Sequence, residues 1–193
     1  MQKPVQPRYN LQYAIIFYHN WRNTLNRASY RRWLIPLIVG LLALSLDQLS
    51  KWWAVRTLGP EPFTGVIPLI GDWSRLVYSR NTGIAFSMLQ GHPEILTLTA
   101  LAIISGAIYF YWNHLPSQRL LPQLVIGLIV GGALGNVIDR VRLGYVVDFI
   151  SVGWWPIFNL ADSAIFVGAA LLMVMFVRDD IEHRRDRQQA VSI

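Results

Sequence analysis

The chain has no cysteine, and only 15% of its 193 residues are Asp, Glu, Lys or Arg. Without cysteine it can hold no disulfide, no thiolate metal site and no cysteine nucleophile. Its four histidines are scattered, and it has no HExxH, GxSxG or P-loop sequence, so we expect no metal and no cofactor. Soluble domains carry roughly 25% charged residues, so the low charge indicates a membrane protein.

Hydrophobic residues make up 53% of the chain, and they gather in four segments, at about 34–55, 95–112, 120–138 and 158–177. Each is close to the roughly 20 apolar residues that a transmembrane helix needs. The second and third are separated only by "NHLPSQR", which predicts a tight antiparallel pair. We therefore expect an all-α membrane protein, a bundle of four transmembrane helices that carries one small extracytoplasmic β-sheet.

The sheet is expected between the first and second helices, at about 57–91, where glycine, proline and short β-branched runs predict two or three strands. The membrane domain spans 34–178. Residues 1–33 form an N-terminal extension, for which a surface helix and a disordered basic tail are equally favoured, and residues 179–193 form a solvated tail.

Basic residues are concentrated at the ends of the apolar segments. The side that holds both termini and the 113–119 loop carries eleven of the 17 Lys and Arg, which predicts that both termini are cytoplasmic. The formal net charge of +6 follows this distribution, so it indicates membrane topology and not a nucleic-acid partner.

Polar residues inside the apolar segments gather at the opposite, extracytoplasmic side. They are Asp47, Lys51, Asn81, Asn136, Asp139, Arg140, Asp148, Asn159 and Asp162. Ionisable groups in a membrane are costly and are functional by default. Helical spacing places Asp47 and Lys51 on one face and Asn136, Asp139 and Arg140 on another.

Two neighbouring carboxyl groups in an apolar site share a proton, because both cannot easily ionise. The ionised group can then activate a water molecule while the protonated group hydrogen-bonds a substrate carbonyl. Asp139 is followed directly by Arg140, whereas Asp148 and Asp162 lack a cation nearby in the sequence. We therefore favour Asp148 with Asp162, and Asp139 with Asp162 stays the alternative.

Other interpretations remain open at this point. Intramembrane carboxylates also line proton or cation pathways, and Ser50 beside Lys51 allows a serine–lysine peptidase. A scaffold would explain the helices but not the aspartates. Asp47 and Lys51 either anchor a helix as an interfacial ion pair or support the site. Gly127, Gly131 and Gly135 predict close helix packing, which would bring Asn136 and Asp139 near Asp162 on the fourth helix.

Four sequence blocks, "SLDQLSKWWAV", "NTGIAFSML", "GGALGNVIDRVRLGYVVDFI" and "FNLADSAI", together resemble the lipoprotein signal peptidase family, also called signal peptidase II. The resemblance covers about 34–178; the first 33 residues have no counterpart in it, and the stretch between Asp148 and Asp162 is compact. It implies an aspartic endopeptidase of the bacterial inner membrane, with its site near the extracytoplasmic face.

The resemblance also implies the substrate and the role of each residue. The substrate would be a diacylglyceryl-modified prolipoprotein, cut before its lipidated cysteine, so the partners are prolipoproteins and membrane lipid, and we expect a monomer. Asp148 and Asp162 would be catalytic. Asn136, Asp139 and Arg140 would hold the site together and bind the substrate backbone, and Asp47, Lys51, Asn81 and Asn159 would complete the polar shell.

Overall fold

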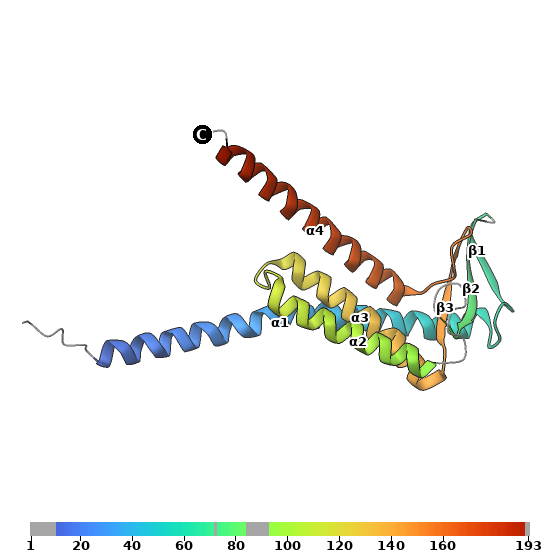
Figure 1. The fold of residues 1–193 in the computed structure, drawn as a ribbon. Coiled ribbons are helices and arrows are strands. Elements are labelled where there is room, and N and C mark those ends of the chain that lie inside the picture. The colour runs from blue at the N-terminus through green and yellow to red at the C-terminus, as the bar shows by residue number, and fades with distance from the viewer. Residues whose placement is uncertain (1–10, 72, 84–92, 192–193) are drawn as a thin grey trace, which may run out of the picture.

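A computed structural model of the protein describes residues 11–71, 73–83 and 93–191. The elements, in chain order, are α1 (Leu11–Leu58), β1 (Val66–Ile70), β2 (Ser74–Asn81), α2 (Pro93–His114), α3 (Leu120–Leu143), β3 (Val146–Val152) and α4 (Leu160–Val191). Figure 1 shows the sheet at one end of the helices, and α1 and α4 extending beyond the bundle at the other end.

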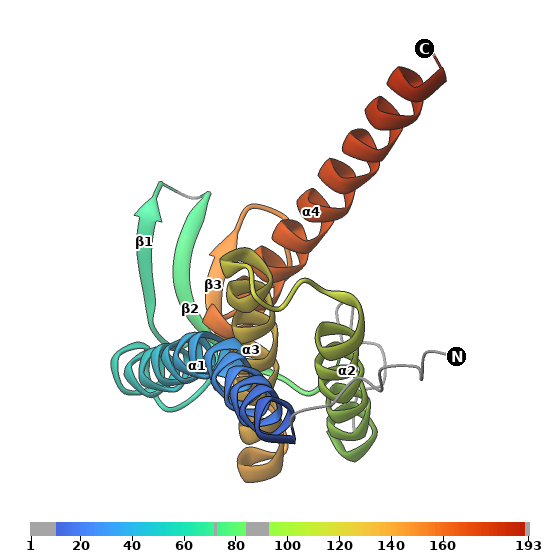
Figure 2. The ribbon, with the colours of Figure 1, turned by 90° about the vertical axis from the view of Figure 1, so that its left-hand side faces the viewer.

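Among the described residues, four helical segments are long and apolar enough to cross a membrane, which confirms the predicted architecture. They are Arg32–Leu58, Glu94–His114, Leu120–Leu143 and Leu160–Arg178. The third is largely buried, whereas the other three present most of their surface outward. Figure 2 shows α3 in the middle of the bundle. It contacts each of the other helices, so its polar residues can meet partners from both sides.

Small residues set the spacing of the bundle. A Cβ atom added at Gly131 would meet the backbone of Gly40 in α1, and one at Gly132 would lie 2.5 Å from the Ala161 carbonyl in α4. α3 therefore approaches both helices backbone to backbone, as small residues allow in lipid. The predicted close packing is present, and the row of Gly127, Gly131 and Gly135 faces mainly α1.

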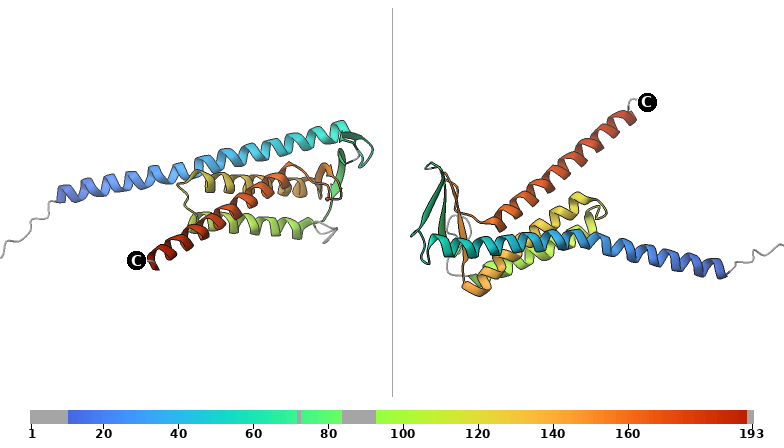
Figure 3. Two further views of the ribbon diagram at one scale, coloured as in Figure 1. Left: turned by 90° about the horizontal axis from the view of Figure 1, so that it is seen from above. Right: turned by 180° about the vertical axis from the view of Figure 1, so that it is seen from behind.

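The segment before the first span is helical from Leu11 onward and continues into the span without a break, forming the 48-residue α1. The right-hand view of Figure 3 shows this continuity. Pro36 lies inside α1. Because proline has no N–H, the Arg32 carbonyl four residues earlier loses its helical donor. The Tyr111 hydroxyl of α2 donates to that carbonyl at 2.6 Å, which satisfies it from a neighbouring helix.

The sheet is antiparallel, with the strand order β1-β2-β3. The sequence analysis expected strands within 57–91, where β1 and β2 lie; residues 72 and 84–91 of that range are outside the described residues. The third strand comes from the segment between α3 and α4, outside the range in which the sequence analysis expected the sheet. Val147 and Phe149 of β3 pack with Ala54 and Leu58 of α1, and this cluster fastens the sheet to the end of the bundle.

α3 ends at Gly144, whose backbone is left-handed, with φ 79°, and whose N–H donates to the Arg140 carbonyl at 3.0 Å. Glycine adopts this conformation without a steric penalty and so ends helices. β3 begins two residues later, at Val146. The tight turn therefore puts the Asp148 strand directly beside the polar end of α3.

Candidate active site

α4 begins with a reciprocal cap that fixes Asp162. Asn159 precedes the first helical residue, and its side-chain oxygen accepts the Asp162 N–H at 2.9 Å. In return, the Asp162 carboxylate accepts the Asn159 N–H at 3.3 Å. Such a pair satisfies two free N–H groups of the helix start, where the dipole also favours an anion. The Asp162 carboxylate is therefore held in place by the helix it helps to start.

Asp148 lies on β3 opposite Ser79 of β2, and it is 1% exposed. The pairing shifts between Leu76 and Ser79, so β2 carries one extra residue just before this point. A bulge of this kind turns side chains to a new direction and is frequent beside active sites. The Asp148 carboxylate accepts two side-chain amides, from Asn81 at 2.8 Å and from Asn159 at 2.7 Å.

Asn159 therefore connects the two carboxylates, since it touches Asp148 through its side chain and Asp162 through its backbone. Asn136 of α3 completes the link. Its amide donates to Asp162 at 2.7 Å, and its oxygen accepts from Asn159 at 3.1 Å. Four segments of the chain thus converge on these two carboxylates, which come from different elements, as the sequence analysis expected.

A second polar cluster surrounds Lys51. Its ammonium group lies 2.8 Å from Asp47 and 2.9 Å from Asp139, and it donates to the Asn136 oxygen at 3.0 Å. Asp139 also accepts the N–H of Val147 at 3.1 Å, and Asp47 accepts the N–H of Ala161 at 2.9 Å. The sequence analysis expected both Asn136 and Asp139 to lie near Asp162. Asn136 does contact Asp162 on α4, whereas Asp139 contacts α1 and β3 instead.

Gln48 belongs to the same cluster, and the sequence analysis missed it. Its amide donates to Asp47 at 3.2 Å and to Asp139 at 3.0 Å. One signal was available, because Gln48 directly follows Asp47 inside the apolar segment at about 34–55. A neutral amide in a membrane segment attracts less attention than a charge, although it too needs partners there.

Arg140 and Ser50 have fewer contacts with the two polar clusters than the residues described above. The Arg140 guanidinium is half-buried and donates to the Asn136 carbonyl at 3.5 Å, and within the described part of the chain it forms no ion pair. The Ser50 hydroxyl donates to the Asp47 carbonyl at 2.8 Å, while Lys51 is held by two carboxylates. This geometry gives no support to a serine–lysine pair.

Burial, and to a lesser degree the nearby Asp162 carboxylate, raise the pKa of Asp148 from the ordinary 3.8 to about 7. The amides of Asn81 and Asn159 act in the opposite direction but are weaker. Two carboxyl groups whose environments differ in this way can divide the acid and base roles between them. The arrangement can hold one proton near neutral pH and use it in hydrolysis.

Comparisons with known proteins agree with one another. The family model described as signal peptidase (SPase) II matches residues 38–178. This chain belongs to the signal peptidase II family. A lipoprotein signal peptidase of Syntrophomonas wolfei is 40% identical over 146 residues, covering 76% of this chain and 95% of that protein. One of Mycobacterium avium is 41% identical over 154 residues, covering 76% and 81%.

A solved structure described as a bacterial membrane enzyme superposes with a TM-score of 0.68 at 30% identity, covering 75% of this chain and 88% of that chain. The signal peptidase II match begins before Asp47 and ends after Asp162, so it contains both polar clusters. Membership of the family identifies the chain as a multi-pass membrane peptidase.

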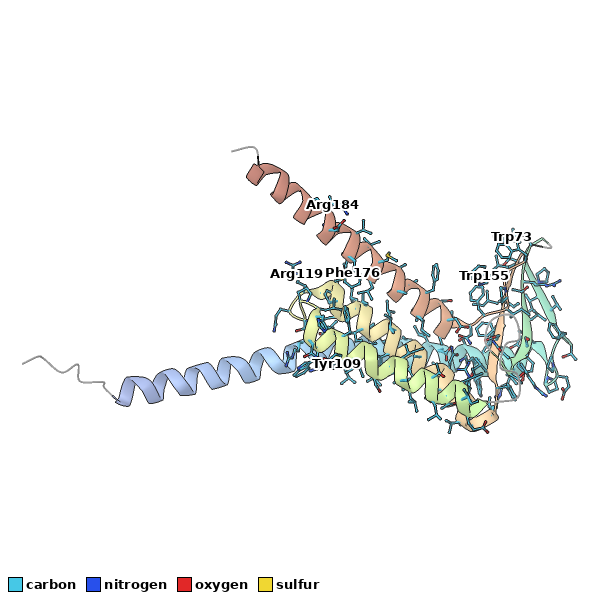
Figure 4. The ribbon with its side chains drawn as sticks, in the orientation of Figure 1. Trp73, Tyr109, Arg119, Trp155, Phe176 and Arg184 are labelled. Atoms are coloured by element: carbon cyan, nitrogen blue, oxygen red, sulfur yellow. The ribbon has the colours of Figure 1, made fainter. Side chains whose placement is uncertain are left out.

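A largely apolar cavity of about 610 Å³ opens beside Asp162 in this signal peptidase II fold. Its lining includes Trp73, Trp155, Phe158 and Phe166, and Asp162 is among the few polar residues in its wall. Figure 4 shows Trp73 and Trp155 close together at the sheet end of the molecule. One candidate carboxylate therefore borders a space suited to a hydrophobic ligand.

Proposed function

We propose that the protein is an aspartic endopeptidase that removes the signal peptide from diacylglyceryl-modified prolipoproteins, cutting before the lipidated cysteine. The observation that carries this proposal is the pair Asp148 and Asp162, joined through Asn159, with an apolar cavity on one side. The relatives' name, lipoprotein signal peptidase, supports the substrate class.

Asp148 holds the proton and Asp162 acts as the base. Burial and the neighbouring carboxylate raise the pKa of Asp148 to about 7, which favours its protonated form. Asp162 accepts two hydrogen bonds, from Asn136 and from the Asn159 backbone, and lies in the first turn of α4, so its carboxylate is held in position to act as the base.

In the proposed reaction, Asp162 takes a proton from a water molecule as the water oxygen bonds to the scissile carbonyl carbon. Asp148 gives its proton to the carbonyl oxygen, which produces a neutral tetrahedral diol. The C–N bond then breaks as Asp162 returns its proton to the leaving nitrogen, and Asp148 regains a proton from the diol. Both carboxyl groups end in their starting states.

The remaining polar residues support this reaction. Arg140, which lacks an ion-pair partner among the described residues, offers its guanidinium to a substrate backbone carbonyl. Lys51 holds Asp47 and Asp139, which in turn hold the backbone of α4 and β3 through Ala161 and Val147. Asn81, Asn136 and Asn159 orient the dyad.

We further propose that the enzyme acts as a monomer in the bacterial inner membrane, with both termini in the cytoplasm. The basic residues beside the termini and the 113–119 loop support this orientation. The dyad would then lie near the extracytoplasmic face, and the cavity lined by Trp73, Trp155 and Phe166 would receive the lipid of the substrate.

The test compares Asp148→Asn and Asp162→Asn with the unchanged enzyme, using a diacylglyceryl-modified preprolipoprotein in detergent micelles and a gel-shift readout. Each variant should lose roughly 100- to 10,000-fold in turnover, because each removes one proton-transfer group. Asp180→Asn, which changes an exposed aspartate of α4, is the matched control and should keep full turnover. Undiminished turnover in both dyad variants would refute the proposal.

A second arm tests the substrate class. The same preprolipoprotein without its diacylglyceryl group should remain uncut under conditions in which the lipidated form is processed. Equal processing of both forms would leave a membrane aspartic peptidase but would exclude recognition of the lipid.

A further inference from the structure

The end of the bundle opposite the sheet carries a second large apolar groove. It has a volume of about 510 Å³ and lies between α1, α2 and α3, lined among others by Trp33, Leu37, Leu41, Ile108 and Val130. Its lining contains none of the residues of the candidate active site. The groove is therefore separate from the cavity beside Asp162.

A polar network lies next to this groove, at the depth where the spans end. Arg32 is the first residue of the first span, and it directly precedes Trp33 of the lining. The Tyr111 hydroxyl bonds both the Arg32 carbonyl, at 2.6 Å, and the Ser117 carbonyl, at 3.4 Å. Gln123 donates to the same Ser117 carbonyl at 2.8 Å. The network thus ties together the first three spans.

Two buried side-chain atoms here have no hydrogen-bond partner within the described residues: the Arg32 Nε and the Gln123 Oε1. Buried polar atoms are nearly always paired, and an unpaired one indicates strain or a missing ligand. Gln123 is 5% exposed, and Arg32 has no ion-pair partner among the residues described. The Arg32 guanidinium lies flat over Trp112, 3.6 Å from the ring centre.

A ligand that fits this place needs two features. It must present an anionic acceptor to the Arg32 guanidinium and an apolar chain to the groove. An anionic glycerophospholipid has both, and Arg, Trp and Tyr are typical of the headgroup layer. A free phosphate would satisfy Arg32 but would leave the groove empty.

We propose that this groove binds one molecule of a phosphatidylglycerol-type lipid, with its phosphate at Arg32 and one acyl chain between α1, α2 and α3. Trp112 beneath the guanidinium fixes the direction in which Arg32 presents its donors. The bound lipid lies beside the segment where Pro36 interrupts α1 and where Tyr111 satisfies the freed Arg32 carbonyl. It acts as a structural ligand on the membrane face away from the peptidase site.

The experiment measures lipid binding to the full chain by native mass spectrometry from detergent micelles. The probes are dioleoyl-phosphatidylglycerol, dioleoyl-phosphatidylcholine and glycerol 3-phosphate. We expect one saturable phosphatidylglycerol molecule per chain, and Arg32→Gln should bind it about tenfold more weakly, because a charge-assisted hydrogen bond is lost. Arg119→Gln removes an exposed arginine near the same end of the bundle (Figure 4) and should bind normally.

Leu37→Trp provides a second variant, which fills the groove and leaves Arg32 in place. It should also reduce retention of phosphatidylglycerol, even if Arg32→Gln fails to fold. Equal binding of phosphatidylcholine, or an equal loss in Arg119→Gln, would mean an unspecific lipid shell and would overturn the proposal. Glycerol 3-phosphate competing as well as the lipid would exclude the acyl chain's role. Peptidase activity is not the readout, so the result is independent of the dyad.

Discussion

Two pairs of aspartates lie within one polar region, and they are held in different ways. Asp47 and Asp139 flank Lys51 at 2.8 and 2.9 Å, so the two buried carboxylates share one cation. Asp148 and Asp162 are held by the amides of Asn81, Asn136 and Asn159, none of which carries charge. Asp47 and Asp139 are therefore balanced by a lysine and hold the helices and the sheet together. Asp148 and Asp162 can lower their charge only by taking up a proton.

The comparison explains why sequence alone left three aspartates competing for two catalytic places. Asp139 is paired with a lysine 88 positions earlier in the chain, and not with Arg140 beside it, which supports the proposed choice of Asp148 with Asp162. A buried charge whose partner is removed costs far more than the pair contributes. The two pairs should therefore respond in opposite ways to substitution and to pH.

The largest effect on stability is expected for Lys51→Met, which leaves Asp47 and Asp139 buried without a cation. Breaking a buried pair in this way costs about 3–5 kcal/mol, so the free energy of unfolding should fall by that amount. The control is Arg56→Met, which removes an exposed cation from the same helix and should cost less than about 1 kcal/mol. Unfolding in mixed micelles measures both, and equal losses would contradict the charge-compensation argument.

The next effect concerns pH. Asp148, with its pKa raised to about 7, is protonated below that pH and loses its proton above it. Because the proposed mechanism needs one proton on the pair, kcat/KM should fall about tenfold for each pH unit above about 7. A rate that stays constant from about pH 6 to about pH 9, with the enzyme folded throughout, would contradict the proposed roles.

A smaller effect is expected for Asn159→Ala, which removes both the α4 cap and the amide on Asp148. Loss of a cap costs about 0.5–2 kcal/mol, and turnover should fall further because Asp148 and Asp162 lose their common partner. Asn113→Ala, at an exposed site on α2, is the control for stability and turnover. Unchanged turnover in Asn159→Ala would show that the dyad does not need this connection.

The smallest effect on stability is expected for an exposed ion pair that has the same i,i+4 spacing as Asp47 and Lys51. Asp180 and Arg184 are four residues apart and 2.7 Å from each other, like Asp47 and Lys51, but both are more than half exposed. An exposed pair of this kind contributes about 0.3–0.5 kcal/mol, so Arg184→Gln should barely change the unfolding midpoint. A loss as large as that of Lys51→Met would mean that burial does not decide the cost.

The four spans, the sheet region and the gathering of polar residues at one end follow from hydropathy and helical spacing, which are local properties. β3 could not be predicted with the same ease, because its residues 146–152 become a strand only by pairing with β2. Nor could local patterns show that Tyr111 satisfies the carbonyl freed by Pro36, or that Lys51 reaches Asp139. These contacts join residues 79 and 88 positions apart, and the catalytic roles themselves remain predictions.

β3 also determines when the candidate site can be completed during synthesis. β2 leaves the ribosome two membrane crossings before the strand that will cover its open edge, so the early hairpin has nothing to pair with on that side. Asp148 arrives with β3 itself, and Asp162 follows with the start of α4. The two aspartates proposed as catalytic can therefore meet only after α1, α2 and α3 have been made.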